Sequence, residues 1–490
     1  MSVIRPQPPD DPLGYDPAAV FATGAVPRSS FDAVCDRLDE VRDRLLAEAA
    51  AADARDMAAA AGTAATDTAA VSGEATPGLA FVSLPERLLA EYRADRPASR
   101  LFAILQAART IREAVDRLVV VGGGGVLAGM RAVVASCCHP LHDALARGDR
   151  GGRPRLSFVA AGLDNDSLQA LLDLVAPAGR PRSDDLLDRW ALLVAGVDDQ
   201  PQHTAAARRL LLAALRDAAA DDPTILAARL VAIDRPGGRI AAWGRALGGA
   251  GFMVPPGLAG PEAVLTAAGL VPAAVAGVDV VRLLEGAAAL AVRFREAPKE
   301  DNPVLLHAAI ARLAEVELGC GVRLTCCWSP RLEWPGRWHD QLVGGRAGRG
   351  AVPLTIVAPR DLPAHAPRPQ ERRGSVLVTN LRAGEPRCDP LAVPAAIAPG
   401  VDPPPCPESA AATLPALLAV AEAEARDAAA LARRPSADIL LPRVDEHAIG
   451  QLLQLLMLSA AVEDRLARPA ARSRSATLRD LEPARVGPGG

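Results

Sequence analysis

The chain has 490 residues, of which half are apolar and only 3% are aromatic. With 54 basic and 58 acidic residues the formal net charge is −4, which excludes a nucleic-acid-binding surface spread over the whole chain. The 43 prolines and 41 glycines follow no fixed period, which excludes collagen-like and most disordered classes. Because a domain has ~150 residues, the length predicts two or three packed units.

The amino terminus and the cysteines indicate the cellular compartment. The first twelve residues are rich in Pro and Asp where a signal peptide would need an apolar core, and no run of ~18 apolar residues occurs. The eight cysteines show no C-x-x-C spacing, so we interpret them as buried thiols rather than as a zinc site or a disulfide framework. We therefore expect a soluble, cytoplasmic protein. Lys299 is the only lysine, which leaves almost no group for amine chemistry.

The first predicted element is a single amphipathic helix near the amino terminus. Its apolar positions, spaced by three and four, are Phe31, Val34, Leu38, Val41 and Leu45. This stripe packs either on its own domain, which we favour, or against a partner helix. The sequence from 49 to 77 is mostly Ala, Asp, Thr and Gly, which predicts a helix tail that continues into a linker.

From residue 84 onward, short β-branched runs alternate with longer amphipathic segments. Continuous apolar strands between helices are typical of a parallel sheet covered on both faces. The predicted strands are 118–121, 156–160, 190–195, 226–233 and 252–254 in a first series, and 322–327, 354–357, 376–379 and 439–441 in a second. The sequence thus predicts an α/β fold with two doubly wound parallel sheets. A helical block joins the two units, and an apolar helix over 448–466 follows the second.

These patterns predict five segments along the chain. They are an N-terminal helix and linker (1–83), a first α/β domain (84–263), connecting helices (264–300), a second α/β domain (301–444), and a C-terminal helix and tail (445–490).

Four glycines, Gly122 to Gly125, follow the first predicted strand and precede a helix. A turn of this kind brings backbone N–H groups against an anion at a helix N-terminus. The match to a dinucleotide-binding fingerprint is weak, because no strand ends in an acidic residue about twenty positions later. A tight turn without a ligand and a dinucleotide site both remain open from these residues alone.

Longer segments resemble glucose-6-phosphate isomerase from about residue 84 to 466. Those that carry the resemblance include VVVGGGGVLAGMRA, VLTAAGLVPAAVAGVDVVRLLEGA, Asp301-Asn302-Pro303-Val304, Trp338-His339-Asp340-Gln341-Leu342 and Asp445-Glu446-His447-Ala448-Ile449-Gly450-Gln451-Leu452. The resemblance implies two doubly wound sugar-isomerase (SIS) domains with helical N-terminal and C-terminal extensions. It also implies a dimer that interconverts glucose 6-phosphate and fructose 6-phosphate through an enediolate, without a metal or other cofactor.

The positions that carry catalysis in that family hold other residues here. Pro261 stands where the resemblance implies the arginine that stabilises the enediolate, and Gly345 stands where it implies the glutamate base. Pro363 replaces the histidine of ring opening, and the C-terminal lysine falls near Arg479. The implied substrate contacts that remain are Gly125 and Gln341.

A further departure lies in the turn that binds the phosphate in the family, which is rich in hydroxyl groups. The corresponding residues here are Ala195, Val197, Asp198, Asp199 and Gln200. Two carboxylates at this place would repel a phosphate dianion instead of binding it. We therefore expect a degenerate phosphate site.

Three hypotheses follow. The first is a homologue of glucose-6-phosphate isomerase that has lost catalysis and acts as a binding or partner subunit, either as a homodimer or as a heterodimer with an intact isomerase. The second is an active isomerase on an altered sugar, with His365 or Glu371 as its base. The third and weakest is a dinucleotide-binding protein at the glycine turn. The first implies a sugar or sugar-phosphate ligand, no metal or cofactor, no nucleic acid and no membrane partner.

Overall fold

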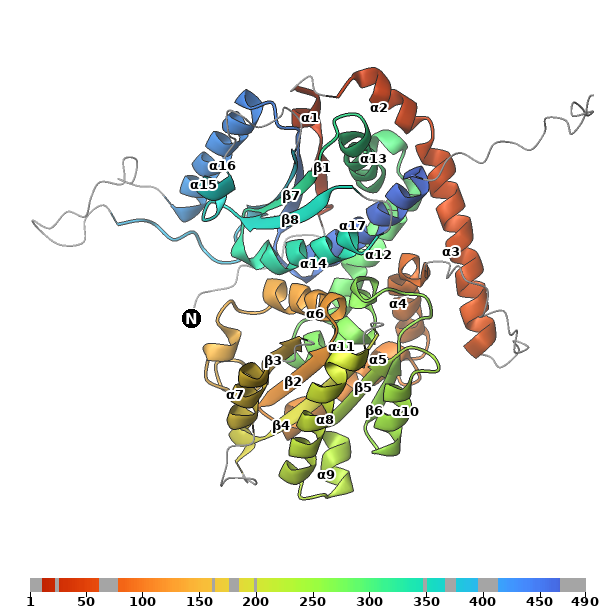
Figure 1. Ribbon diagram of the computed structural model, residues 1–490, viewed down its shortest axis with the longest axis vertical. Coiled ribbons are helices and arrows are strands. Elements are labelled where there is room, and N and C mark those ends of the chain that lie inside the picture. Colours follow the sequence, from red (N-terminus) through yellow and green to blue (C-terminus); the bar gives the residue numbers. More distant parts are fainter. Residues whose placement is uncertain are drawn as a thin grey trace, which may run out of the picture.

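The computed structural model describes residues 11–22, 26–60, 78–160, 164–175, 185–197, 201–346, 350–365, 376–394 and 413–467. Two five-stranded sheets form two lobes, one above the other, and a layer of helices lies between them (Figure 1). Within the described ranges, none of the helices has an apolar stretch of membrane-spanning length.

The first sheet has the strand order β3-β2-β4-β5-β6, and all its neighbouring strands are parallel. Its strands are β2 (Arg117–Gly122), β3 (Arg155–Ala160), β4 (Trp190–Gly196), β5 (Leu230–Asp234) and β6 (Ala250–Met253). Strand β2 lies inside the sheet, and both Val119 and Val120 are fully buried because each face carries helices. This is the parallel sheet that the apolar runs predict.

Helices cover both faces of the first sheet. The helices on the sides of this lobe are α4 (Leu84–Ala94), α5 (Arg100–Ala114), α6 (Gly124–Cys137), α7 (Asn165–Val175), α8 (Pro201–Ala218), α9 (Pro223–Ala228) and α10 (Arg239–Ala246). The predicted strand 226–233 was wrong in its first half, because Asp222 caps a short helix there and β5 begins only at Leu230. The side chain of Asp222 accepts hydrogen bonds from the backbone of Thr224 and Ile225, which fixes the start of α9.

The second sheet has the order β1-β10-β9-β7-β8. Its strands are β1 (Gly14–Asp16), β7 (Val322–Cys327), β8 (Val352–Val357), β9 (Val376–Glu385) and β10 (Ser436–Arg443). Strands β7 to β10 are parallel, whereas β1 pairs antiparallel with β10. The short strand β1 was not predicted, and it joins the amino-terminal segment to the second sheet.

The two faces of the second sheet are covered unequally. Helices α13 (Pro303–Val316) and α14 (Glu333–Gly344) pack on the inner face, and α15 (Leu362–His365) and α16 (Leu414–Leu431) lie on the outer face, at the left (Figure 1). Along β7, Cys327 packs inward beside Leu332, while Leu324 and Cys326 belong to a separate outer cluster. This alternation follows from the two-residue period of a strand.

The centre of the molecule is formed by α11 (Ala267–Ala276), α12 (Val280–Glu296) and α17 (Glu446–Ala467). Two glycines allow α12 and α17 to touch backbone to backbone. A Cβ atom on Gly286 would lie 1.9 Å from the His447 carbonyl oxygen, and one on Gly450 would lie 1.9 Å from that of Leu283. The core is continuous through this layer from one lobe to the other.

The amino-terminal helix is divided. The stripe predicts one helix, but the structure has α1 (Ala18–Ala22), α2 (Arg28–Cys35) and α3 (Leu38–Ala60), with a break at Asp36 and Arg37. The stripe residues Leu38 and Leu45 are fully buried within this chain. The short 3₁₀ turns are Ala80–Val82, His142–Ala144, Leu186–Asp188, Pro261–Leu265 (η5), Lys299–Asp301 and Pro330–Leu332.

Candidate functional site

The glycine turn ends against Pro261. Helix α6 begins at Gly124, and a Cβ atom on Gly125 would lie 2.6 Å from Cδ of Pro261, which is closer than real side chains approach. Pro261 begins the turn η5. The requirement for glycine at position 125 is therefore explained by contact with this chain's own proline.

Helix α14 completes the same site from the second lobe. The indole Nε1 of Trp338 donates a hydrogen bond of 2.8 Å to the Pro261 carbonyl oxygen. The side-chain oxygen of Gln341 lies 3.9 Å from the place that a Cβ atom on Gly124 would occupy. The structure thus brings the two remaining family contacts, Gly125 and Gln341, together with the substituted position Pro261 at the junction of the lobes.

Gly345 lies at the same junction. It follows α14 directly, and its backbone N–H donates to the Gln341 carbonyl oxygen at 3.3 Å. The next residue, Arg346, forms an ion pair of 2.7 Å with Glu262, which is the residue after Pro261. An ion pair thus joins the residues that directly follow the two substituted positions, Pro261 and Gly345.

Sequence reasoning missed Glu262 and Arg346. Both substituted positions, Pro261 and Gly345, lack a charge, so neither points to an ion pair beside it. The signal that could have found the pair is that a carboxylate and a guanidinium directly follow these two positions, with the charge signs exchanged.

The Glu262–Arg346 pair is buried and its polar atoms are occupied. Glu262 is only 5% exposed, and its Oε2 also accepts a hydrogen bond of 2.9 Å from the backbone N–H of Ala259. Burial raises the pKa of this carboxyl group, and the nearby Arg346 opposes the shift. The Arg346 guanidinium also pairs with Asp464 on α17 and donates to the Ala460 carbonyl oxygen. The pair therefore connects η5 with the end of α14 and with α17.

Asp340 is a second carboxyl group with an altered acidity at this junction. Burial raises its pKa to about 6, although the nearby Thr355 and Arg337 oppose the shift. It lies on α14, one residue before Gln341. The side chain faces the second sheet, because Thr355 is on β8.

Only the first part of the expected phosphate turn is described. Ala195 lies near the end of β4 and Val197 follows that strand, and both are buried. Asp198, Asp199 and Gln200 lie outside the described residues, as do Arg479 and Glu371. The degenerate phosphate site therefore remains a prediction.

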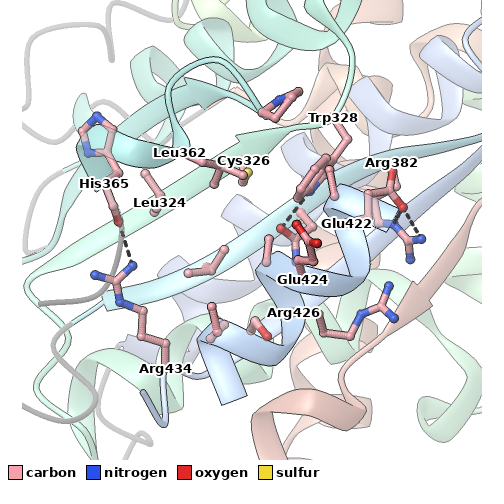
Figure 2. A pocket seen from close by; sticks show the side chains of 18 of the residues that line it. Leu324, Cys326, Trp328, Leu362, His365, Arg382, Glu422, Glu424, Arg426 and Arg434 are labelled. Atoms are coloured by element: carbon pink, nitrogen blue, oxygen red, sulfur yellow. Dashed lines mark hydrogen bonds and ion pairs between the residues drawn. The ribbon is translucent and has the colours of Figure 1, made fainter. Parts of the chain in front are cut away.

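Pro363 and His365 are not at the junction. Both belong to α15, on the outer side of the second sheet, where they line a separate cavity (Figure 2). The carbonyl oxygen of His365 accepts a hydrogen bond of 3.0 Å from Arg434. Gln341, by contrast, lies on α14 at the inner side of the sheet. Within this chain His365 is thus not placed to act beside Gly125 and Gln341.

Comparisons with known proteins show what the whole chain resembles. No family model matches the sequence. The glucose-6-phosphate isomerase of Symbiobacterium thermophilum is 31% identical over 320 residues, which cover 64% of this chain and 66% of that protein. The one from Heliobacterium modesticaldum is 29% identical over 297 residues, which cover 60% and 63%. The matched region thus spans slightly less than two thirds of these relatives.

Two solved structures show the same fold. A hypothetical protein from Thermus thermophilus superposes with a TM-score of 0.70 at 21% identity, over 93% of this chain and 94% of that one. A glucose-6-phosphate isomerase from Chlamydia trachomatis superposes with a TM-score of 0.57 at 16% identity, over 77% and 70%. The chain is therefore a divergent homologue of glucose-6-phosphate isomerase, with the α/β fold of the sugar isomerases.

Proposed function

We propose that this chain is a non-catalytic homologue of glucose-6-phosphate isomerase that acts as a binding or partner subunit. One observation carries the proposal. At the junction, Pro261 packs on Gly125 and Gly345 has no side chain, while the adjacent charges of Glu262 and Arg346 neutralise each other in a buried pair.

The chemistry of the family explains why this arrangement matters. An enediolate route needs a carboxylate that reaches a carbon-bound proton and a cation that stabilises the developing negative charge. Loss of a general base costs about 10²–10⁴ in rate, and loss of an electrostatic stabiliser costs about 10²–10³. The two rate factors cannot simply be multiplied when both groups are lost. Either loss alone would lower the turnover rate far below that of an intact isomerase.

Proton exchange tests the catalytic half of the proposal. The purified chain is incubated with glucose 6-phosphate or fructose 6-phosphate in deuterated water, and proton NMR follows the signal of the hydrogen that the family reaction transfers. An intact glucose-6-phosphate isomerase is the positive control. We expect no exchange above the protein-free background, and exchange at a rate near that of the control would overturn the proposal.

The partner half of the proposal has a separate test. Sedimentation of the purified chain, alone and mixed with an intact isomerase, measures which assemblies form. We expect a homodimer, or a heterodimer in the mixture, because the resemblance implies a dimeric family. A chain that sediments as a monomer in both samples would contradict this half only.

A second candidate function is an isomerase that uses Glu262 as its base. The raised pKa of this carboxyl group and its place beside Pro261 favour it. In that case the unmodified chain exchanges the proton and the Glu262→Gln variant does not. The alternatives with His365 or Glu371 as the base receive no such support, since His365 lines the outer cavity and Glu371 is outside the described residues.

A further inference from the structure

The outer face of the second sheet contains a cavity of about 390 Å³, between the strands and helices α15 and α16 (Figure 2). This volume is within the range of small-molecule sites in proteins. Its apolar walls are formed by Leu324, Cys326, Val378, Leu362, Ala421 and Ala425. The cavity is separate from the junction, because its wall residues belong to the outer cluster of this sheet.

The charged groups inside the cavity are already paired. Arg382 donates from Nη1 to Asp438 at 2.9 Å and from Nε to Glu422 at 2.8 Å. The amide nitrogen of Asn380 donates to the other oxygen of Asp438 at 2.7 Å, and its oxygen accepts from the indole of Trp328 at 3.2 Å. This network crosses from β9 to β10 and α16. Among the described lining residues, it leaves no uncompensated charge in the interior to attract an ion.

The rim of the cavity is also balanced in charge. Glu424 and Arg426, both on α16, are exposed there, and Arg434 lies at the other end. Together with Arg382, Glu422 and Asp438, the lining thus contains as many arginines as carboxylates. A charged ligand would gain no net attraction and would lose its hydration on entry.

One polar group of the wall is free to contact a ligand. Ser436 begins β10 and is only 5% exposed, and its hydroxyl group makes no hydrogen bond within the described part of the chain. The hydroxyl oxygen is not fully enclosed by the protein, so a ligand group in the cavity can form a hydrogen bond with it. A hydroxyl can both donate and accept, so a hydroxyl, amine or amide on the ligand suits it.

We propose that this cavity binds a small, uncharged organic molecule with a mainly apolar body and a single hydrogen-bonding group. The apolar walls take the body, and the hydroxyl of Ser436 contacts the polar group. This site is independent of any activity at the junction, since the two do not share a residue.

A pair of fluorescent probes tests both the presence of the site and its preference for uncharged ligands. N-phenyl-1-naphthylamine is apolar and uncharged and has one N–H group, and 8-anilino-1-naphthalenesulfonate has the same ring skeleton with an added negative charge. Each is titrated into the purified full chain, and its fluorescence increase gives the dissociation constant. We expect saturable binding of the uncharged probe and binding of the sulfonate at least tenfold weaker.

Three variants locate the bound probe. Ala425→Trp places a large side chain in the cavity and is expected to weaken binding at least tenfold. Ala423→Trp is the matched control, because Ala423 is exposed on the same helix and does not line the cavity. Ser436→Ala removes the hydroxyl group with little change in volume and is expected to weaken binding about two- to tenfold. Circular dichroism and thermal unfolding confirm that each variant is folded.

Each outcome decides the proposal. Weakened binding in Ala425→Trp and Ser436→Ala, with unchanged binding in Ala423→Trp, supports it. Equal binding by all variants, no saturable binding of the uncharged probe, or tighter binding of the sulfonate would each overturn it. If Ala425→Trp does not fold, Ser436→Ala still decides the proposal: weaker probe binding supports it, and binding equal to that of the unmodified chain overturns it.

Discussion

The junction between the lobes and the outer face of the second sheet are packed in opposite ways. At the junction, Pro261 occupies the space beside Gly125, and α12 and α17 touch through Gly286 and Gly450. On the outer face a cavity remains, because α15 has only four residues and α16 buries little of its surface. The comparison shows that the junction is closely packed and that space for a ligand remains on the outer face.

The outer face of the first sheet, by contrast, is fully covered by helices. There, α7, α8 and α10 pack on the strands, and Leu192, Val194 and Trp190 are almost fully buried. Both sheets follow the same rule of apolar strands between helices. The lobes therefore differ in how closely the helices pack on the outer face, since α16 has only Glu422 among its fully buried residues.

The largest expected effect concerns the buried pair at the junction. Glu262→Ala leaves Arg346 with only Asp464, and loss of one partner of a buried pair costs about 3–5 kcal/mol, so we expect a loss of roughly 3 kcal/mol in the free energy of unfolding. Urea unfolding measures it. The control is Glu113→Ala, which breaks an exposed pair with Arg109 and is expected to change the stability very little. Equal costs for the two variants would show that the junction is not closely packed.

The next effect tests the contact between Gly125 and Pro261. Gly125→Val pushes a side chain into the proline ring, and overpacking of this kind costs about 1–3 kcal/mol. Gly124→Ala is the matched control, because its Cβ atom would meet only the Gln341 side chain, at 3.9 Å. We expect thermal unfolding at a lower temperature for the first variant only. An unchanged unfolding temperature for Gly125→Val would show that there is free space beside the glycine turn.

The third effect is the pH dependence that Asp340 introduces. Its folded pKa of about 6 is above the ~3.9 of an unfolded chain, so the neutral form is favoured in the folded state. The associated stability is fully present below about pH 4 and is lost as the pH rises through about 6, by up to about 2 kcal/mol. Asp340→Asn removes this dependence. Unfolding free energies at about pH 4 and pH 8 check it, and identical pH profiles for the two proteins would contradict it.

The smallest effect belongs to the outer cavity. A bound ligand at ten times its dissociation constant stabilises a protein by about 1.4 kcal/mol. We expect N-phenyl-1-naphthylamine to raise the thermal unfolding temperature of the unmodified chain and of Ala423→Trp, but not of Ala425→Trp. An equal rise of the unfolding temperature in Ala425→Trp would show that the probe binds outside the cavity. The outer face would then not differ from the junction in offering a binding site.

Much of the fold could be predicted from the sequence because buried parallel strands are continuous apolar runs. The strands around Leu118, Trp190 and Val322 and the final helix were confirmed for this reason. The strand β1 could not be predicted, since Gly14 to Asp16 has no apolar run and is held by tertiary contacts, namely its pairing with β10 and the packing of Tyr15 on His307. Tertiary pairing of this kind leaves no local signal.

The candidate site was predictable only in part. The resemblance singles out Gly125, Pro261 and Gln341 as site positions, and the structure shows that all three lie at the junction. The ion pair of Glu262 and Arg346 joins residues that are far apart in sequence, and neither matches a family position. The outer cavity depends on how far α16 stands from the sheet, which composition and spacing do not determine.

Steady-state turnover tests the central claim most directly. The rate of interconversion of glucose 6-phosphate and fructose 6-phosphate is measured for the purified chain, for Glu262→Gln and for an intact isomerase. We expect a kcat at least about 10⁴-fold below that of the intact enzyme, and no further decrease in Glu262→Gln. A kcat near that of the intact enzyme, or a large fall on Glu262→Gln substitution, would contradict the loss of catalysis.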